Sequence, residues 1–175
     1  MKLRAFPNRR QTIAALIAAI VFTAIAPHMV AARETVAFSG YSPGTIVVMT
    51  NERQLYYVLG QGRALRYPVG VGRAGMAWQG RAYVERKLIR PSWGPPPDIA
   101  RTNPNIPYNI PGGSPNNPMG AAVLGLNRGN YAIHGTNNPG SIGHFVSYGC
   151  IRMHNEDIMD LYRRASVGTE VVVRP

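Results

Sequence analysis

The sequence contains a single cysteine, Cys150, among its 175 residues, and this scarcity excludes an intramolecular disulfide. Small exported proteins that use cysteine structurally usually carry an even number of cysteines. A lone thiol is therefore either a small inert residue of the core or a reactive group. The count alone leaves both interpretations open.

Acidic residues are also scarce, because 8 Asp and Glu stand against 19 Lys and Arg, for a formal net charge of +11. Such an excess predicts attraction to a polyanion. Teichoic acids, acidic lipids, a carboxylate-rich cell wall and nucleic acid all satisfy this condition. A basic surface that serves only solubility is the alternative.

No apolar run is long enough to span a membrane, since the longest, Thr12–Ala26, covers 15 residues and a transmembrane helix needs about 20. It is preceded by Lys2, Arg4, Arg9 and Arg10 and followed by Val30-Ala-Ala32. This pattern predicts a secretory signal peptide over residues 1–32. An uncleaved anchor and a twin-arginine signal at Arg9-Arg10 are the alternatives to the general secretory route. Cleavage after Ala32 would leave 15 basic and 8 acidic residues, a net charge of +7, and export makes nucleic acid an unexpected partner.

The remaining chain predicts a short linker over residues 33–43 and one mainly β domain over 44–175. Strands rich in β-branched and aromatic residues are expected at 44–50, 54–59, 63–71, 121–126, 131–133 and 170–174, the first three as an antiparallel meander. One main helix is expected from Asn155 to Ser166. Asn155 would be its N-cap, with acidic residues in the first turn and Arg163-Arg164 in the last. We predict a mixed β-sheet or sandwich covered by this helix.

Nine of the fifteen prolines lie between Pro91 and Pro118. Proline fixes φ and removes a hydrogen-bond donor, so we expect a long ordered loop here rather than sheet or helix. Trp93, Tyr108 and Ile110 supply apolar anchors. Long loops in compact domains that are not disordered are usually functional.

The candidate catalytic residues lie in the segment from Tyr131 to His154. A strand ends in His134, a glycine-rich loop follows, and Cys150 lies on a Ser-Tyr-Gly-Cys turn just before the helix. A thiol is activated by a neighbouring imidazole and by a helix N-terminus, so we predict Cys150 as nucleophile and His134 as its base. Arg152 can favour the thiolate or hold a carboxylate or oxyanion, and the backbone N–H groups of Gly149 and Cys150 are candidate oxyanion donors.

His134 is not the only candidate base in this stretch. His144 lies in the glycine-rich loop and His154 precedes the predicted helix, and either imidazole offers an alternative base. The group that orients His134 is a backbone carbonyl, a hydroxyl or a distant carboxylate, and the sequence leaves this open. The spacings fit no closed zinc site and Arg152 would oppose a cation, so no metal and no cofactor are expected.

The same stretch resembles the signature of the YkuD-type L,D-transpeptidase catalytic domain family, in which a His-Gly pair is followed by Ser-His-Gly-Cys, a hydrophobic residue and Arg. Three further segments are similar to this family: Tyr67-Pro-Val-Gly-Val-Gly-Arg73, Lys87 with Pro91-Ser-Trp-Gly-Pro-Pro-Pro97, and Met119-Gly-Ala with Ala132-Ile-His-Gly. The resemblance runs from about Gly44 to Val173. The sequence departs from the family at Tyr148, where the motif has His, and at Ala77-Trp-Gln-Gly80, where the family often has Thr-Pro before the glycine.

The resemblance implies a cysteine acyltransferase that acts on the peptide stems of peptidoglycan. Cys150 would form a thioester with a donor tetrapeptide, and an amine of a second stem or of a wall-anchored lipoprotein would resolve it. It also implies that Tyr148 tunes rather than abolishes activity. The candidate substrate- and oxyanion-binding residues are Arg152, Gly149, Ser147, Tyr148, Gly135, His144 and Trp93.

The sequence leaves three alternatives to a transferase. They are a carboxypeptidase or hydrolase on the same cysteine and histidine, a noncatalytic wall-binding module, and an unrelated exported β protein with a buried thiol. For the transferase we expect a periplasmic or wall location and a monomer.

Overall fold

A computed structural model describes residues 33–175, so the predicted signal segment over residues 1–32 lies outside the described part of the chain. Among the described residues, no helix is both long and apolar enough to cross a membrane. The elements are β1 (Glu34–Ala37), β2 (Ile46–Met49), β3 (Gln54–Gly60), β4 (Arg63–Pro68), β5 (Val71–Gly72), β6 (Gly80–Ile89), α1 (Pro97–Thr102), β7 (Ala122–Leu126), β8 (Ala132–His134), β9 (Phe145–Ser147), β10 (Ile151–Arg152), α2 (Asn155–Arg164) and β11 (Glu170–Arg174), with a short 3₁₀ turn at Pro139–Ser141.

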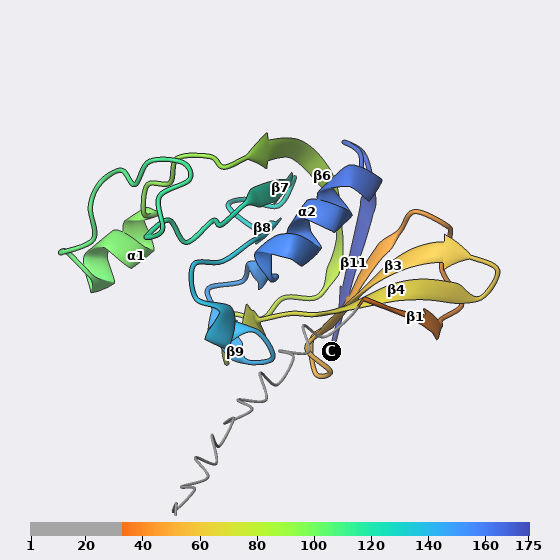
Figure 1. The fold of residues 1–175 in the computed structure, drawn as a ribbon. Coiled ribbons are helices and arrows are strands. Elements are labelled where there is room, and N and C mark those ends of the chain that lie inside the picture. Colours follow the sequence, from red (N-terminus) through yellow and green to blue (C-terminus); the bar gives the residue numbers. More distant parts are fainter. Residues whose placement is uncertain (1–32) are drawn as a thin grey trace, which may run out of the picture. The chain divides into compact units, whose positions relative to one another are not determined.

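Nine of these strands form one mixed sheet, in the order β1-β4-β3-β2-β11-β6-β7-β8-β10, and β5 pairs with β9 separately. The predicted meander is confirmed, because β2, β3 and β4 pair in antiparallel succession. The last strand, β11, inserts between β2, to which it is parallel, and β6, to which it is antiparallel. Figure 1 shows β1, β3 and β4 at one end of this arrangement and the loop that carries α1 at the other.

The long strand β6 joins the two halves of the sheet. Its first part pairs with β11, and its second part, from Val84 to Ile89, pairs with β7. A β-bulge lies where the partner changes, since Val84 faces Leu126 and Arg86 faces the next residue, Gly125. The bulge shifts the alternation of side chains by one residue, and this break explains why the sequence did not predict the strand.

The main core lies between the sheet and α2. Leu124, Ile133 and Ile151 point from the sheet into the same buried cluster as Ile158 and Leu161 of the helix. The helix was predicted to end at Ser166 but ends at Arg164. The expectation that Asn155 is the N-cap was wrong, because His154 occupies the N-cap position and Asn155 is the first helical residue.

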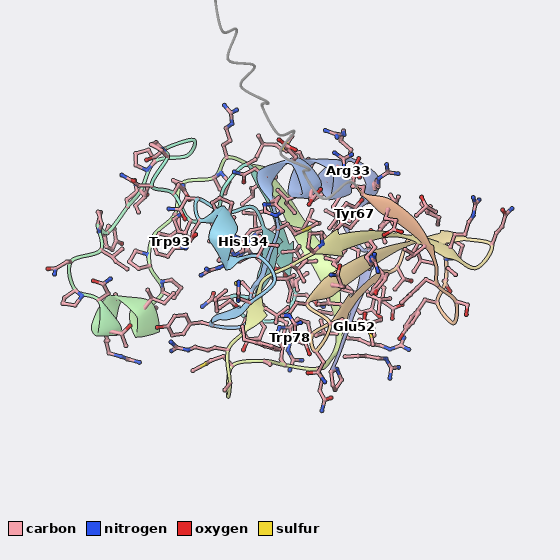
Figure 2. The ribbon with its side chains drawn as sticks, turned by 60° about the horizontal axis from the view of Figure 1, so that its bottom comes forward. Arg33, Glu52, Tyr67, Trp78, Trp93 and His134 are labelled. Atoms are coloured by element: carbon pink, nitrogen blue, oxygen red, sulfur yellow. The ribbon has the colours of Figure 1, made fainter. Side chains whose placement is uncertain are left out.

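Side chains of Lys87, Tyr67 and Arg33 fix α2 to the rest of the domain. The Lys87 Nζ of β6 donates to the carbonyls of Tyr162 (2.7 Å) and Ala165 (2.6 Å) at the C-terminal end of the helix, where a cation is favourable. The Tyr67 hydroxyl donates to Asp160 Oδ2 at 2.7 Å. Arg33 reaches the same carboxylate at 3.1 Å, on the same side as Tyr67 in Figure 2.

The proline-rich segment 91–118 is ordered, as expected, but Tyr108 does not anchor it as predicted, because Tyr108 is 91% exposed. Trp93 and Ile110 exchange two backbone hydrogen bonds, at 2.9 and 2.7 Å. The buried Asn117 amide donates to the carbonyls of Pro91, Ile110 and Pro111. The expectation of no helix here was wrong, because α1 begins at Pro97, where proline needs no N–H partner and its fixed φ suits a first helical turn.

Candidate active site

The register of β8 and β10 brings the two predicted catalytic side chains to one face of the sheet. These strands are parallel, with Ile151 opposite Ile133 and Arg152 opposite His134. The two isoleucines are buried in the core that α2 covers. Because side chains alternate along a strand, His134, Arg152 and Cys150 face the opposite side.

On that side lies a cavity of about 750 Å³, lined by His134, Cys150 and Arg152. Residues of β6 and β7, including Arg86 and Val123, extend its floor, and the proline-rich segment forms another wall. No residue of α2 lines the cavity. The predicted activation of Cys150 by the helix N-terminus is therefore not supported, since β10 intervenes and the thiol faces away from the helix.

The imidazole of His134 is held by its own neighbouring carbonyl. Its side chain is 2% exposed, and Nδ1 lies 2.6 Å from the Gly135 oxygen. In the neutral ring Nδ1 then donates the hydrogen, which leaves Nε2 as the acceptor. The orienting group that the sequence left open is thus a backbone carbonyl. The pKa of His134 is lowered to about 4, mainly by burial and also by the charge of Arg152, while the carbonyls of Gly135 and Pro118 oppose this shift.

Asn155 fixes the loop that carries this carbonyl. Its Oδ1 accepts from the backbone N–H groups of Ala121 (2.9 Å) and Thr136 (3.1 Å), and its amide donates to the Thr136 carbonyl at 3.0 Å. A Cβ on Gly135 would lie 2.3 Å from the Asn155 Oδ1, so only glycine fits there. Asn155 therefore ties α2 to the start of β7 and to the loop that follows His134.

Cys150 is partly exposed, and its thiol donates weakly to the Asn130 carbonyl at 3.8 Å. Burial raises the pKa of the Cys150 thiol, while the backbone N–H of Ala132 and the charge of Arg152 oppose that rise. Burial also lowers the pKa of Arg152, which the nearby thiolate counteracts. These shifts favour the uncharged thiol of Cys150 and the uncharged imidazole of His134 at neutral pH.

The turn before Cys150 is closed by hydrogen bonds within itself. The buried Ser147 hydroxyl donates to the Cys150 carbonyl at 2.6 Å and accepts from the Gly149 N–H at 3.0 Å. The Gly149 N–H is therefore engaged inside the turn and is not available as the predicted oxyanion donor. Ser147 lines the cavity, but its hydroxyl has both of these partners in the turn.

Trp78 also stabilises this turn. Its indole N–H donates to the Gly149 carbonyl at 2.9 Å, and its ring stacks on Tyr131 with centroids 5.6 Å apart. Gly149 has a φ of +120°, and a Cβ there would lie 2.4 Å from the Tyr131 ring. Glycine is required at this position on both counts. The sequence showed Trp78 only as a departure from the family pattern.

Tyr148 lines the cavity and contacts Arg73 and Thr102. The Arg73 guanidinium lies 4.0 Å from the centroid of its ring. A hydrogen bond from Thr102 of α1 lowers the pKa of Tyr148, and Arg73 lowers it further. The residue that replaces the family histidine thus contacts the segment that covers the site.

The other predicted binding residues divide into two groups. Trp93 lines the cavity, and Figure 2 shows it beside His134 on the side of the proline-rich segment. Gly135 and the exposed His144 do not line it. Sequence reasoning missed Arg86 and Asn130, which do line it.

The comparisons with known proteins agree with this fold. The model of the YkuD family, described as the L,D-transpeptidase catalytic domain, matches residues 43–173. The class is therefore a mainly β catalytic domain with one main helix. The chain belongs to the YkuD family of L,D-transpeptidase catalytic domains.

Individual relatives give the extent of the similarity. The probable L,D-transpeptidase ErfK/SrfK of Escherichia coli is 39% identical over 137 residues, which cover 73% of this chain and 43% of the relative. The match thus spans less than half the length of that relative. An L,D-transpeptidase from Mycobacterium smegmatis has the same fold, with a TM-score of 0.58 at 18% identity, over 75% of this chain and 58% of that one.

One solved structure carries a different description. A protein from Brucella melitensis described as a probable carnitine operon oxidoreductase is 40% identical, with a TM-score of 0.55, over 86% of this chain and 96% of that chain.

Proposed function

We propose that this protein is an exported peptidoglycan L,D-transpeptidase, with Cys150 as nucleophile and His134 as general base. The observation that carries this proposal is the placement of His134, Cys150 and Arg152 on one face of two paired strands, lining one cavity in a domain of this family. None of the described residues that line the cavity is acidic. An anionic peptide stem suits such a site.

In the first half-reaction the thiol turns from the Asn130 carbonyl and gives its proton to His134 Nε2. The sulfur attacks the carbonyl carbon of the donor's diaminopimelate residue and forms a tetrahedral intermediate. His134 returns the proton to the leaving nitrogen, the C–N bond breaks, and D-Ala departs. The product is a thioester on Cys150.

In the second half-reaction an amine attacks the thioester. His134 takes the proton from the attacking nitrogen, the C–S bond breaks, and the sulfur regains a proton. An amine of a second stem gives a cross-link, and a lysine of a lipoprotein gives an anchored protein. Water in place of the amine gives a hydrolysed stem.

The proline-rich segment favours the amine over water. Trp93 and Ile110 pair across the base of this segment and line the cavity. The Asn117 amide donates to the carbonyls of Pro91 and Ile110, one on each of the two paired segments. A wall fixed in this way limits the access of water to a bound thioester.

The experiment is mass spectrometry of a disaccharide tetrapeptide from a diaminopimelate-containing wall after incubation with the protein, with Cys150→Ala as the matched control. A dimer that has lost D-Ala, absent with the variant, supports transpeptidation. Tripeptide monomer alone identifies a hydrolase. Unchanged substrate, together with a Cys150 that does not react with iodoacetamide, contradicts an enzyme of either kind.

A further inference from the structure

The floor of the cavity holds a second arginine, Arg86, in addition to Arg152. Arg86 lines the cavity from β6, on the opposite side of β7 and β8 from Cys150. Its side chain has one ion-pair partner among the described residues, Glu85, at 3.4 Å. Both side chains are more than half exposed, so the pair is weak and an incoming anion can replace it.

The β-bulge aims Arg86 at the cavity. Ala82 and Val84 of β6 point into the core that α2 covers. Without the bulge Arg86 would share their face, because side chains two residues apart point to the same side. The extra residue at Glu85 turns Arg86 to the other face, while Lys87 reaches the end of α2. Leu88, the next residue on the new face, also lines the cavity.

Gly125 lets the arginine lie across the sheet. It stands opposite Arg86 on β7 and opposite Ala132 on β8. A Cβ at Gly125 would lie 2.7 Å from Cγ, 2.9 Å from Nε and 3.3 Å from Cζ of Arg86. The Arg86 side chain therefore passes over the bare backbone of β7 in the direction of β8. Continuing the β8–β10 register by one residue puts Cys150 beside Ala132, in the same cross-strand row.

We propose that Arg86 is a substrate-binding residue that takes a carboxylate of the donor peptide at this side of the scissile bond, opposite Arg152. A guanidinium is suited to bind a carboxylate through two parallel hydrogen bonds. Two sources carry this chemistry: the side-chain carboxylate of the diaminoacyl residue and the terminal carboxylate of the leaving D-residue. The inference rests on the proposed function for the identity of the donor.

The turnover test compares Arg86→Gln with wild type on three donor tetrapeptides: the free acid, one amidated at the diaminoacyl side chain, and one amidated at the C-terminus. With the free acid, kcat/KM falls roughly 10- to 100-fold, mostly through KM, as expected for a hydrogen bond to a charged group. The amidated donor on which Arg86→Gln has no further effect identifies the carboxylate that is bound. A loss that persists on both amidated donors, or no loss on the free acid, overturns the proposal.

Gly125→Ala supplies a second variant that keeps the charge and moves it. The Arg86 side chain must shift from its path over β7, so kcat/KM falls as in Arg86→Gln, and the double variant loses little more. Arg63→Gln, an exposed charge on distant β4, is the matched control and retains wild-type kinetics. Additive losses in the double variant contradict a shared role.

A measurement that uses no peptide substrate distinguishes the failure of this inference from the failure of the proposed function. Alkylation of Cys150 is measured with anionic iodoacetate and neutral iodoacetamide, and the ratio of the two rates reports positive charge near the thiol. Arg86→Gln lowers this ratio by roughly three- to tenfold, and Arg63→Gln leaves it unchanged. An unchanged ratio in Arg86→Gln overturns the inference even if transpeptidation occurs. A lowered ratio without turnover of any donor contradicts the proposed function alone.

Discussion

At the scale of the residue, the state of His134 decides how the site works. Its imidazole is buried, its Nδ1 is tied to the Gly135 carbonyl, and burial lowers its pKa to about 4. Burial at the same time raises the pKa of Cys150. The sequence indicated both residues as a pair. It could not show their protonation, because that depends on the atoms that other segments pack around them.

The lowered pKa of His134 makes the fold sensitive to acid. The unfolded chain binds a proton at His134 near pH 6.5, whereas the folded chain does so near pH 4. Stability therefore falls as pH drops through this window, by up to about 3 kcal/mol from this group. His134→Gln should remove that part of the loss. Urea unfolding at pH 7 and pH 4 measures it, and an equal loss in both proteins would show that His134 is not buried in the neutral form.

Ser147 offers a test of the turn that carries Cys150, the proposed nucleophile. Ser147→Ala removes the acceptor of the Gly149 N–H and the donor to the Cys150 carbonyl. The first of these hydrogen bonds is buried and the second is partly buried. We expect a loss of about 1–3 kcal/mol in the free energy of unfolding and a fall in kcat. Ser42→Ala, outside the site, is the control for denaturant unfolding. An unchanged stability would mean that the turn does not depend on this hydroxyl.

At the scale of the element, regular patterns were predictable and irregular ones were not. The strands β3 and β11 have continuous β-forming sequence and were expected in place. The strand predicted over 63–71 ends earlier, at Pro68, and Val71–Gly72 pairs separately with β9. The strand β6 was missed because its bulge breaks the alternation beyond Val84. The two residues of β10 are too few to give any periodic signal, although they carry Arg152 beside His134. The helix α1 was hidden by the prolines that begin it.

Lys87 tests how β6 holds the main helix. Its ammonium donates to two carbonyls at the end of α2 and lies 4.3 Å from the centroid of the Tyr162 ring. Lys87→Met should reduce the free energy of unfolding by about 1–3 kcal/mol. Arg81→Met, an exposed ion-pair residue on the same strand, should change it by less than about 1 kcal/mol. Equal effects in the two variants would refute a special role for Lys87.

At the scale of the whole molecule, the order of the strands in the sheet could not be predicted from the sequence. The predicted class, a mixed sheet covered by one main helix, is confirmed. The insertion of β11 between β2 and β6 depends on contacts between residues far apart in the chain. The cavity has the same origin, because β6, β7, β8, β10 and the proline-rich segment build it together. The sequence therefore indicated the proposed nucleophile and base but not the second arginine opposite them.

The basic composition yields a prediction for the whole domain. Residues 33–175 carry 15 basic and 8 acidic side chains. Binding to isolated cell-wall fragments should weaken as salt rises from about 0.1 M to about 1 M, because the Debye length shrinks from about 10 to about 3 Å. Co-sedimentation with the fragments measures this. Binding that does not respond to salt would assign wall affinity to the cavity rather than to the surface charge.

If Cys150 accepts an acyl group from a donor stem, intact-protein mass spectrometry after brief mixing with tetrapeptide donor detects the acyl-enzyme itself. We expect a mass increase equal to the donor less D-Ala, located on the peptide that contains Cys150. The increase should be lost on addition of hydroxylamine and absent in Cys150→Ala. A protein that stays unmodified by the donor while iodoacetamide alkylates Cys150 would show that Cys150 does not accept the acyl group.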